Sequence, residues 1–131
     1  QECLKKGISM IHQEILMVPE LSIAQNIFLG KEPSKIIWLR EREINRRTQS
    51  LFDNLGIELH PKVKMKDLSI AQMQMVEIVK AISNKAKVII MDEPTSALSD
   101  KEVSTLFKII KDLKLRKVAI IYISHKMEEI Y

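Results

Sequence analysis

Residues Lys87–Ser99 read KVIIMDEPTSALS, a short apolar run followed by acids and a proline. The run Val88–Met91 stops abruptly at two carboxylates, Asp92 and Glu93. A second apolar run, KVAIIYIS, occupies Lys117–Ser124. Continuous apolar runs, unlike alternating ones, are typical of strands that are buried on both faces of a sheet. We therefore predict two fully buried strands here.

The segment between these runs has the pattern of a helix. Its apolar residues recur at helical spacing: Val103, Leu106, Phe107, Ile110 and Leu113. Ser99, with Glu102 three positions later, predicts a capping box at the start of this helix. Strand–helix–strand order predicts a parallel sheet with right-handed crossovers, hence an α/β fold. GISMIHQ, at Gly7–Gln13, is predicted to add a short buried strand, and HKMEEI, at 125–130, to begin a last helix.

The middle of the chain is mostly helical in pattern. Ser22 is predicted to cap a short helix that Gly30 ends, and Arg40–Leu55 carries apolar residues at helical spacing. A further helix starts at Ser69 in the sequence LSIAQMQMVEIVKAI. We expect residues 22–86 to form a helical insertion between the strands.

Length and composition limit the class of protein. The chain has 131 residues, so we expect at most one domain, and its charge of +4 comes from interleaved acids and bases. We therefore expect no nucleic-acid partner. A single cysteine, Cys3, excludes an internal disulfide and favours a reducing compartment such as the cytosol. Because the sequence does not begin with Met, we interpret it as a piece of a longer protein.

Polar residues at the predicted strand ends are candidates for phosphate chemistry. Ligands of parallel α/β sheets bind at the carboxyl ends of the strands. There Asp92 can hold Mg²⁺, Glu93 can orient or deprotonate a water, and His125 can contact a phosphate oxygen. Gln13 can bridge a metal-bound water. Taken singly, each has a structural alternative, as a loop acid, a cap or a hydrogen-bonding residue at a strand end.

Ser69 is a candidate for anion binding. Its hydroxyl and the free N–H groups of the first helical turn form an anion site that the helix dipole favours. With Gln72 three positions later it also makes a capping box. The alternative for Ser69 is an ordinary helix cap.

Taken in order, these elements resemble the ATP-binding cassette of ABC transporters over essentially the whole chain. LSIAQ resembles the signature LSGGQ, VIIMDE resembles Walker B, SALS the D-loop, YISH the switch-histidine loop, and Gln13 falls where the Q-loop glutamine belongs. The residues around these motifs resemble those of the first cassette of duplicated bacterial sugar-importer ATPases of the ribose, galactose and xylose type. The resemblance implies a partial P-loop NTPase fold, a parallel sheet with helices plus an α-helical subdomain.

The resemblance also implies domain limits. Residues 1–131 would be the C-terminal portion of one nucleotide-binding domain. Residues of about 22–86 would form the helical subdomain, and 1–21 with 87–131 the sheet core.

The same resemblance assigns roles to the candidate residues. Asp92 and Gln13 would serve the Mg²⁺ of ATP, and Glu93 would be the general base. His125 would contact the γ-phosphate, and Gln13 would relay the state of the site to the membrane subunit. Residues of the signature would contact ATP held by the opposite cassette: Ser69, Ile70, Ala71 and Gln72.

Several features depart from the family pattern. Ile70 and Ala71 replace the two signature glycines, and the D-loop ends in Ser99 instead of Asp. None of the three glycines fits the phosphate-binding pattern GxxxxGK[ST]. We therefore expect this chain alone to be inactive in ATP hydrolysis. We also expect an incomplete sheet, open at the Val88–Met91 or Ala119–Ile123 edge, and hence self-association or a rearranged packing.

The function that the resemblance implies is ATP hydrolysis coupled to import, with a sugar as the expected cargo. Its partners would be transmembrane permease subunits and a second cassette, and its place the cytoplasmic face of the cell membrane. Two alternatives stay open at this point. One is a non-transport ABC ATPase of the translation-factor or DNA-repair type, and the other is a non-catalytic interaction or regulatory cassette.

Overall fold

The computed structural model describes residues 6–11, 16–31 and 37–126, with the backbone alone for 37–39. The chain divides into two units. One combines residues up to Leu16 with those from Ala81 onward, and the other runs from Met17 to Lys80. The helix predicted at 125–130 falls largely outside the described residues.

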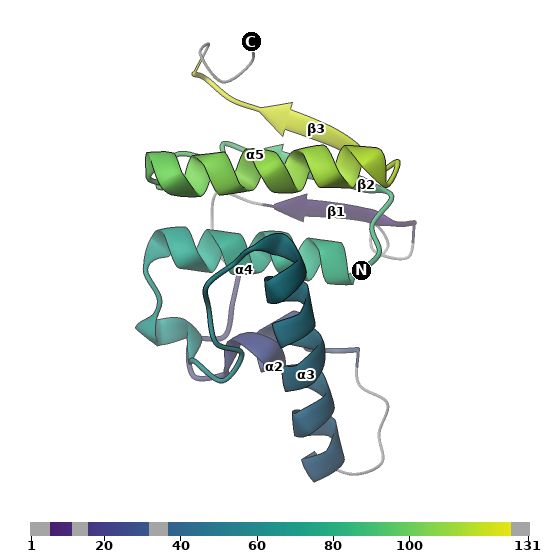
Figure 1. The fold of residues 1–131 in the computed structure, drawn as a ribbon, viewed down its shortest axis with the longest axis vertical. Helices are drawn as coiled ribbons and strands as arrows, with labels where there is room; N and C mark the ends of the chain where they lie inside the picture. Colours follow the sequence, from purple (N-terminus) through teal and green to yellow (C-terminus); the bar gives the residue numbers. More distant parts are fainter. Residues whose placement is uncertain (1–5, 12–15, 32–36, 127–131) are drawn as a thin grey trace. The chain divides into compact units, whose positions relative to one another are not determined.

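The first unit is built on a three-stranded parallel sheet in the order β1–β2–β3 (Figure 1). Its strands are β1 (Ile8–Ile11), β2 (Val88–Asp92) and β3 (Ala119–Ile123). Ile89 of β2 lies opposite Ser9 on one side and Ile120 on the other. The predicted parallel sheet is confirmed, and the carboxyl ends of β2 and β3 lie next to each other.

One face of the sheet is covered by α5 (Asp100–Leu115), the helix that joins β2 to β3. The ring of Phe107 on this helix lies 6.0 Å from that of Tyr122 on β3, centroid to centroid. Three apolar side chains of α5 are buried: Leu106, Ile109 and Leu113. Leu106 and Leu113 were predicted for the packed face of this helix, whereas Ile109 was not; the other predicted residues, Val103, Phe107 and Ile110, are half-buried.

The opposite face of β3 is open in the described part of the chain. Ile121 and Ile123 are 50% and 42% exposed, and Met10 on β1 is 47% exposed. The prediction that Lys117–Ser124 is buried on both faces is therefore wrong here, because α5 covers only one face. The prediction of an open edge at Val88–Met91 is also wrong, because β2 pairs with a strand on each side. Among the described residues, β3 pairs only with β2, so its outer edge is unpaired.

The start of α5 is held by the predicted capping box. The Glu102 carboxylate accepts hydrogen bonds from the Ser99 backbone N–H at 2.8 Å and from the Ser99 hydroxyl at 2.7 Å. These bonds lower the pKa of Glu102, the backbone bond having the larger effect. A carboxylate in the first helical turn also complements the helix dipole. The helix therefore begins at a defined point directly after the loop that carries Asp92 and Glu93.

The second unit is helical. It contains α2 (Ile23–Ile27), α3 (Ile37–Leu55), the 3₁₀ turn η1 (Met65–Asp67) and most of α4 (Ile70–Ser83). Its core is a cluster of seven buried apolar side chains: Ile23, Ile27, Phe52, Met65, Leu68, Val76 and Val79. All of its elements except the 3₁₀ turn were predicted, although α3 begins three residues before the predicted Arg40.

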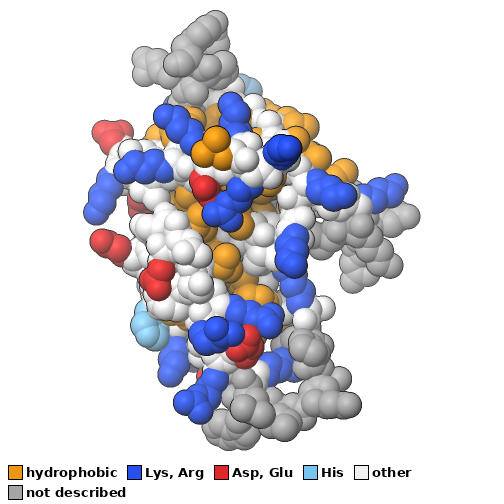
Figure 2. All heavy atoms as spheres, turned by 45° about the vertical axis from the view of Figure 1, so that its right-hand side comes forward, with side chains coloured by type: hydrophobic (Ala, Val, Ile, Leu, Met, Phe, Trp, Pro, Cys, Tyr) orange, Lys and Arg blue, Asp and Glu red, His pale blue; other side chains and the backbone are white. Residues whose placement is uncertain are grey.

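The surface mixes charges of both signs. Lys and Arg side chains are spread over the face drawn in Figure 2, with Asp and Glu side chains among them. On α3, for example, Glu43 pairs with Arg46 at 2.9 Å and with Arg47 at 2.7 Å. Within the described ranges, no helix is long and apolar enough to cross a membrane.

Candidate functional site

The carboxyl end of β2 positions the two acids. Asp92 is the last residue of the strand, and Glu93 follows with a left-handed backbone, φ 47°. The Glu93 N–H donates a hydrogen bond of 2.9 Å to the Ile123 carbonyl oxygen of β3, so the neighbouring strand holds this conformation. Left-handed φ is unfavourable for residues with a Cβ and often occurs at functional sites. The geometry turns the chain sharply at Glu93.

Glu93 and His125 are brought together at this edge. His125 Nε2 lies 2.9 Å from Glu93 Oε1, although the residues are far apart in sequence. The Glu93 side chain is 24% exposed and that of His125 is 88% exposed. The carboxylate is therefore partly buried, whereas most of the imidazole surface faces solvent.

The donor set at Asp92 fits a magnesium ion that is shared with a phosphate substrate. No group of three or more His, Cys, Asp or Glu side chains in the described residues could hold a metal by itself. Mg²⁺ typically uses only one or two protein carboxylates, with waters and substrate phosphates completing its shell. The half-buried Asp92 can supply such a carboxylate. Gln13, the other predicted metal residue, lies outside the described residues.

Ser69 and Gln72 lie in the other unit, at the N-terminus of α4. Gln72 N–H donates to Ser69 Oγ at 3.2 Å, and Ser69 N–H donates to Gln72 Oε1 at 2.9 Å. The predicted capping box is confirmed. Ile70 is 62% exposed, whereas Ala71 is 8% exposed. Neither has a positive φ, so the helical backbone accepts both in place of glycine.

Comparison with known proteins identifies the family. The model of the ABC transporter family matches residues 1–96. The chain belongs to the ABC transporter family. Over 132 residues it is 55% identical to a putative ribose/galactose/methyl galactoside import ATP-binding protein of Geobacillus kaustophilus. The match covers 99% of this chain and 26% of that relative.

Two galactose/methyl galactoside import ATP-binding proteins are also similar over the whole of this ABC family chain. The identity is 52% for the protein of Haemophilus influenzae and 49% for that of Escherichia coli. The chain spans about a quarter of the length of these curated relatives, 26% in both cases.

Solved ABC cassettes share the fold. A dimeric cassette in a post-hydrolysis state, bound to ADP and phosphate, matches with a TM-score of 0.77 at 23% identity. That match covers 93% of this chain and 53% of the solved one. A nucleotide-free cassette from an ABC transporter matches with a TM-score of 0.76. That match covers 98% of this chain and 55% of the solved cassette. The predicted fold class, a partial P-loop NTPase of the ABC type, is confirmed.

One residue that is not a candidate in the sequence is conspicuous in the structure. Asn26 is 1% exposed, although it is polar and lies in a short helix. Asn26 lies next to Ile27 and two residues after Ala24 in a five-residue helix, and a polar residue near these apolar ones could have indicated a buried hydrogen-bonding role.

Proposed function

We propose that this chain is part of the ATP-hydrolysing subunit of an ABC importer whose cargo is a sugar. The observation that carries the hydrolytic role is the Glu93–His125 pair at the carboxyl ends of neighbouring parallel strands. The relatives named for import of ribose, galactose and methyl galactoside, at 49–55% identity, support the cargo class. The proposed activity belongs to the whole subunit, since the chain spans only part of those relatives.

In the proposed reaction, water attacks the γ-phosphorus of ATP and the bond to the ADP oxygen breaks. Glu93 accepts the proton that the attacking water loses, so the products are ADP and phosphate. His125 Nε2, which lies 2.9 Å from Glu93 Oε1, exchanges this partner for a γ-phosphate oxygen. The exchange releases Glu93 Oε1 for the water, which couples the arrival of the phosphate to the activation of the base.

Asp92 and Gln13 are the residues we assign to Mg²⁺. Asp92 would hold the ion, which would supply positive charge against the negative charge that develops during phosphoryl transfer. Gln13 is proposed to contact the metal-bound water and to relay the state of the site to the permease subunit. Both assignments rest on the family resemblance and, for Asp92, on its place at the end of β2.

Ser69–Gln72 are proposed to contact the γ-phosphate of an ATP held by a second cassette. The Ser69 oxygen already accepts the Gln72 N–H, but its own hydroxyl proton can be donated to a phosphate. Since Ala71 is buried and Ile70 projects outward, Ile70 is the residue that must fit against the partner cassette.

The outer edge of β3, which is unpaired among the described residues, supports self-association of the chain when it is produced alone. β3 has no charged residue, and unprotected edges of this kind pair with other strands. A groove of about 600 Å³ between β3 and α5 is lined by Phe107, Ile110, Ile120 and Tyr122, among others. We expect a measured mass above that of one chain in sedimentation at micromolar concentration. A monomer that binds no hydrophobic dye would contradict this proposal.

Transport by the full-length subunit tests the proposed function. Reconstituted with its permease partners in vesicles, it should drive uptake of labelled ribose or galactose with ATP but not with a non-hydrolysable analogue. ATP hydrolysis without uptake of any sugar would favour a non-transport ABC ATPase. Absence of hydrolysis would favour the non-catalytic alternative. The chain of residues 1–131, assayed beside it, should hydrolyse no ATP because it lacks the phosphate loop.

A further inference from the structure

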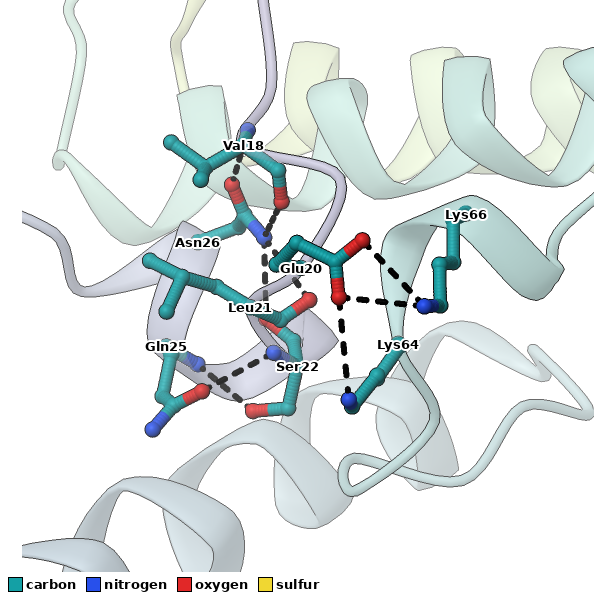
Figure 3. Close-up of polar contacts among 8 residues, drawn as sticks. All are labelled: Val18, Glu20, Leu21, Ser22, Gln25, Asn26, Lys64 and Lys66. Carbon is teal, nitrogen blue, oxygen red and sulfur yellow. Dashed lines mark hydrogen bonds and ion pairs between the residues drawn. The ribbon is translucent and has the colours of Figure 1, made fainter.

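Both the oxygen and the nitrogen of the Asn26 side-chain amide form hydrogen bonds with the backbone of one loop, residues 18–22 (Figure 3). Its Oδ1 accepts the Val18 N–H at 2.8 Å. Its Nδ2 donates to the carbonyl oxygens of Val18 and Ser22, both at 3.0 Å, and of Leu21 at 3.3 Å. One buried side chain thus fixes the backbone of residues 18–22 against α2.

The loop that Asn26 holds is paired with residues 61–66. Lys66 N–H donates to the Pro19 carbonyl and Met65 N–H to the Leu21 carbonyl, both at 3.1 Å. In the other direction, Ile23 N–H donates to the Val63 carbonyl at 2.8 Å. Ser22 and Lys64 form an antiparallel bridge between these bonds. The position of residues 61–66 therefore depends on the loop.

Residues 61–66 lead directly into the signature. Only two residues, Asp67 and Leu68, separate Lys66 from Ser69, so the chain between them spans no more than about 10 Å. Met65 and Leu68 are 1% and 8% exposed and both belong to the core cluster of this unit. A shift of the loop is therefore passed to Ser69 through a short, anchored connection.

The ion pairs in the same region contribute less to the stability of the loop. Glu20 lies 3.0 Å from the Lys66 ammonium group and 3.8 Å from that of Lys64, but all three side chains are exposed. Exposed ion pairs contribute little because solvent screens them. Removing the buried Asn26 amide instead leaves the Val18 N–H without its acceptor and takes one donor from each of three carbonyl groups, those of Val18, Leu21 and Ser22. A backbone donor that loses its partner costs more than an exposed ion pair. Asn26 is therefore the residue that holds the loop.

We propose that Asn26 is a positioning residue for the signature. It sets residues 18–22 against residues 61–66, and this pairing places Ser69 and Gln72 for contact with ATP across the cassette dimer. The inference rests on the proposed function, because it needs Ser69 and Gln72 to contact nucleotide. In this proposal Asn26 does not touch nucleotide itself and acts on Ser69 and Gln72 through the backbone.

The test compares Asn26→Ala with Asn54→Ala, a matched change at an exposed residue of α3. In the full-length subunit, Asn26→Ala should lower kcat for ATP by about tenfold or more, because a small misplacement of a contact group is costly. The affinity for ATP should stay within about twofold, since the main phosphate contacts lie elsewhere. Amide exchange should accelerate about tenfold at Met65, Lys66 and Gln72. Asn54→Ala should change none of these.

Three outcomes would overturn the inference. The first is unchanged kcat despite faster exchange at Met65 and Lys66. The second is faster exchange throughout the protein with equal losses of affinity and kcat, which would make Asn26 a general stability residue. The third is unchanged exchange at all three amides. Glu93→Gln in the same preparation tests the proposed function separately. If it hydrolyses ATP normally, the proposed function fails, and the exchange at Gln72 still decides whether Asn26 positions α4.

Discussion

Replacing Glu93 by Gln is expected to abolish most ATP hydrolysis by the full-length subunit. The neutral amide keeps the size of the side chain and can still accept the hydrogen bond of His125, but it cannot take a proton from water. Loss of a general base typically lowers a rate by about 10²- to 10⁴-fold. The affinity for ATP should change little, because the base is not a main phosphate contact. Single-turnover hydrolysis and nucleotide binding measure the two effects separately.

Glu58→Gln is the matched control for this variant. Glu58 carries the same side chain but lies exposed in a loop of the helical unit, so its replacement should leave the rate unchanged. If Glu93→Gln hydrolyses ATP as fast as the unmodified protein, Glu93 is not the base. This cassette would then be a degenerate or regulatory half, and the chemistry would lie in another site.

Features that depend on near neighbours in sequence were predictable. The capping boxes at Ser69 and Ser99 need only a partner three residues away, and both form. The strands at the two apolar runs also form, and the order of elements predicted their parallel pairing. Because parallel strands end at the same edge of the sheet, the sequence could also point to Glu93 and His125 as candidates for one site.

Features that depend on distant parts of the chain were not predictable. The continuous apolar run of β3 indicates a buried strand, but it does not indicate which elements cover it, and one face is open in the described part of the chain. The left-handed backbone of Glu93 depends on a hydrogen bond to Ile123 in the neighbouring strand. The role of Asn26 depends on the loop at Val18, eight residues before it. No local pattern contains these contacts.

Phe52→Ala is expected to have the largest effect on stability. The Phe52 ring is fully buried, 0% exposed, in the core cluster that also contains Met65 and Leu68. Removing a buried aromatic ring loses its burial energy and leaves a cavity, at a typical cost of about 3–5 kcal/mol. Such a loss is a large part of the total stability of a domain of this size. Urea unfolding followed by circular dichroism, at one fixed protein concentration, measures it.

Leu115→Ala is the control, because Leu115 is 83% exposed and lies outside the cluster. It should change the free energy of unfolding by no more than about 0.5 kcal/mol. A loss below about 1 kcal/mol for Phe52→Ala would mean that the cluster repacks around the missing ring. The cluster also anchors Met65 and Leu68 beside Ser69, so the same variant should accelerate amide exchange at Gln72. Stability and placement of the signature would then depend on one set of side chains.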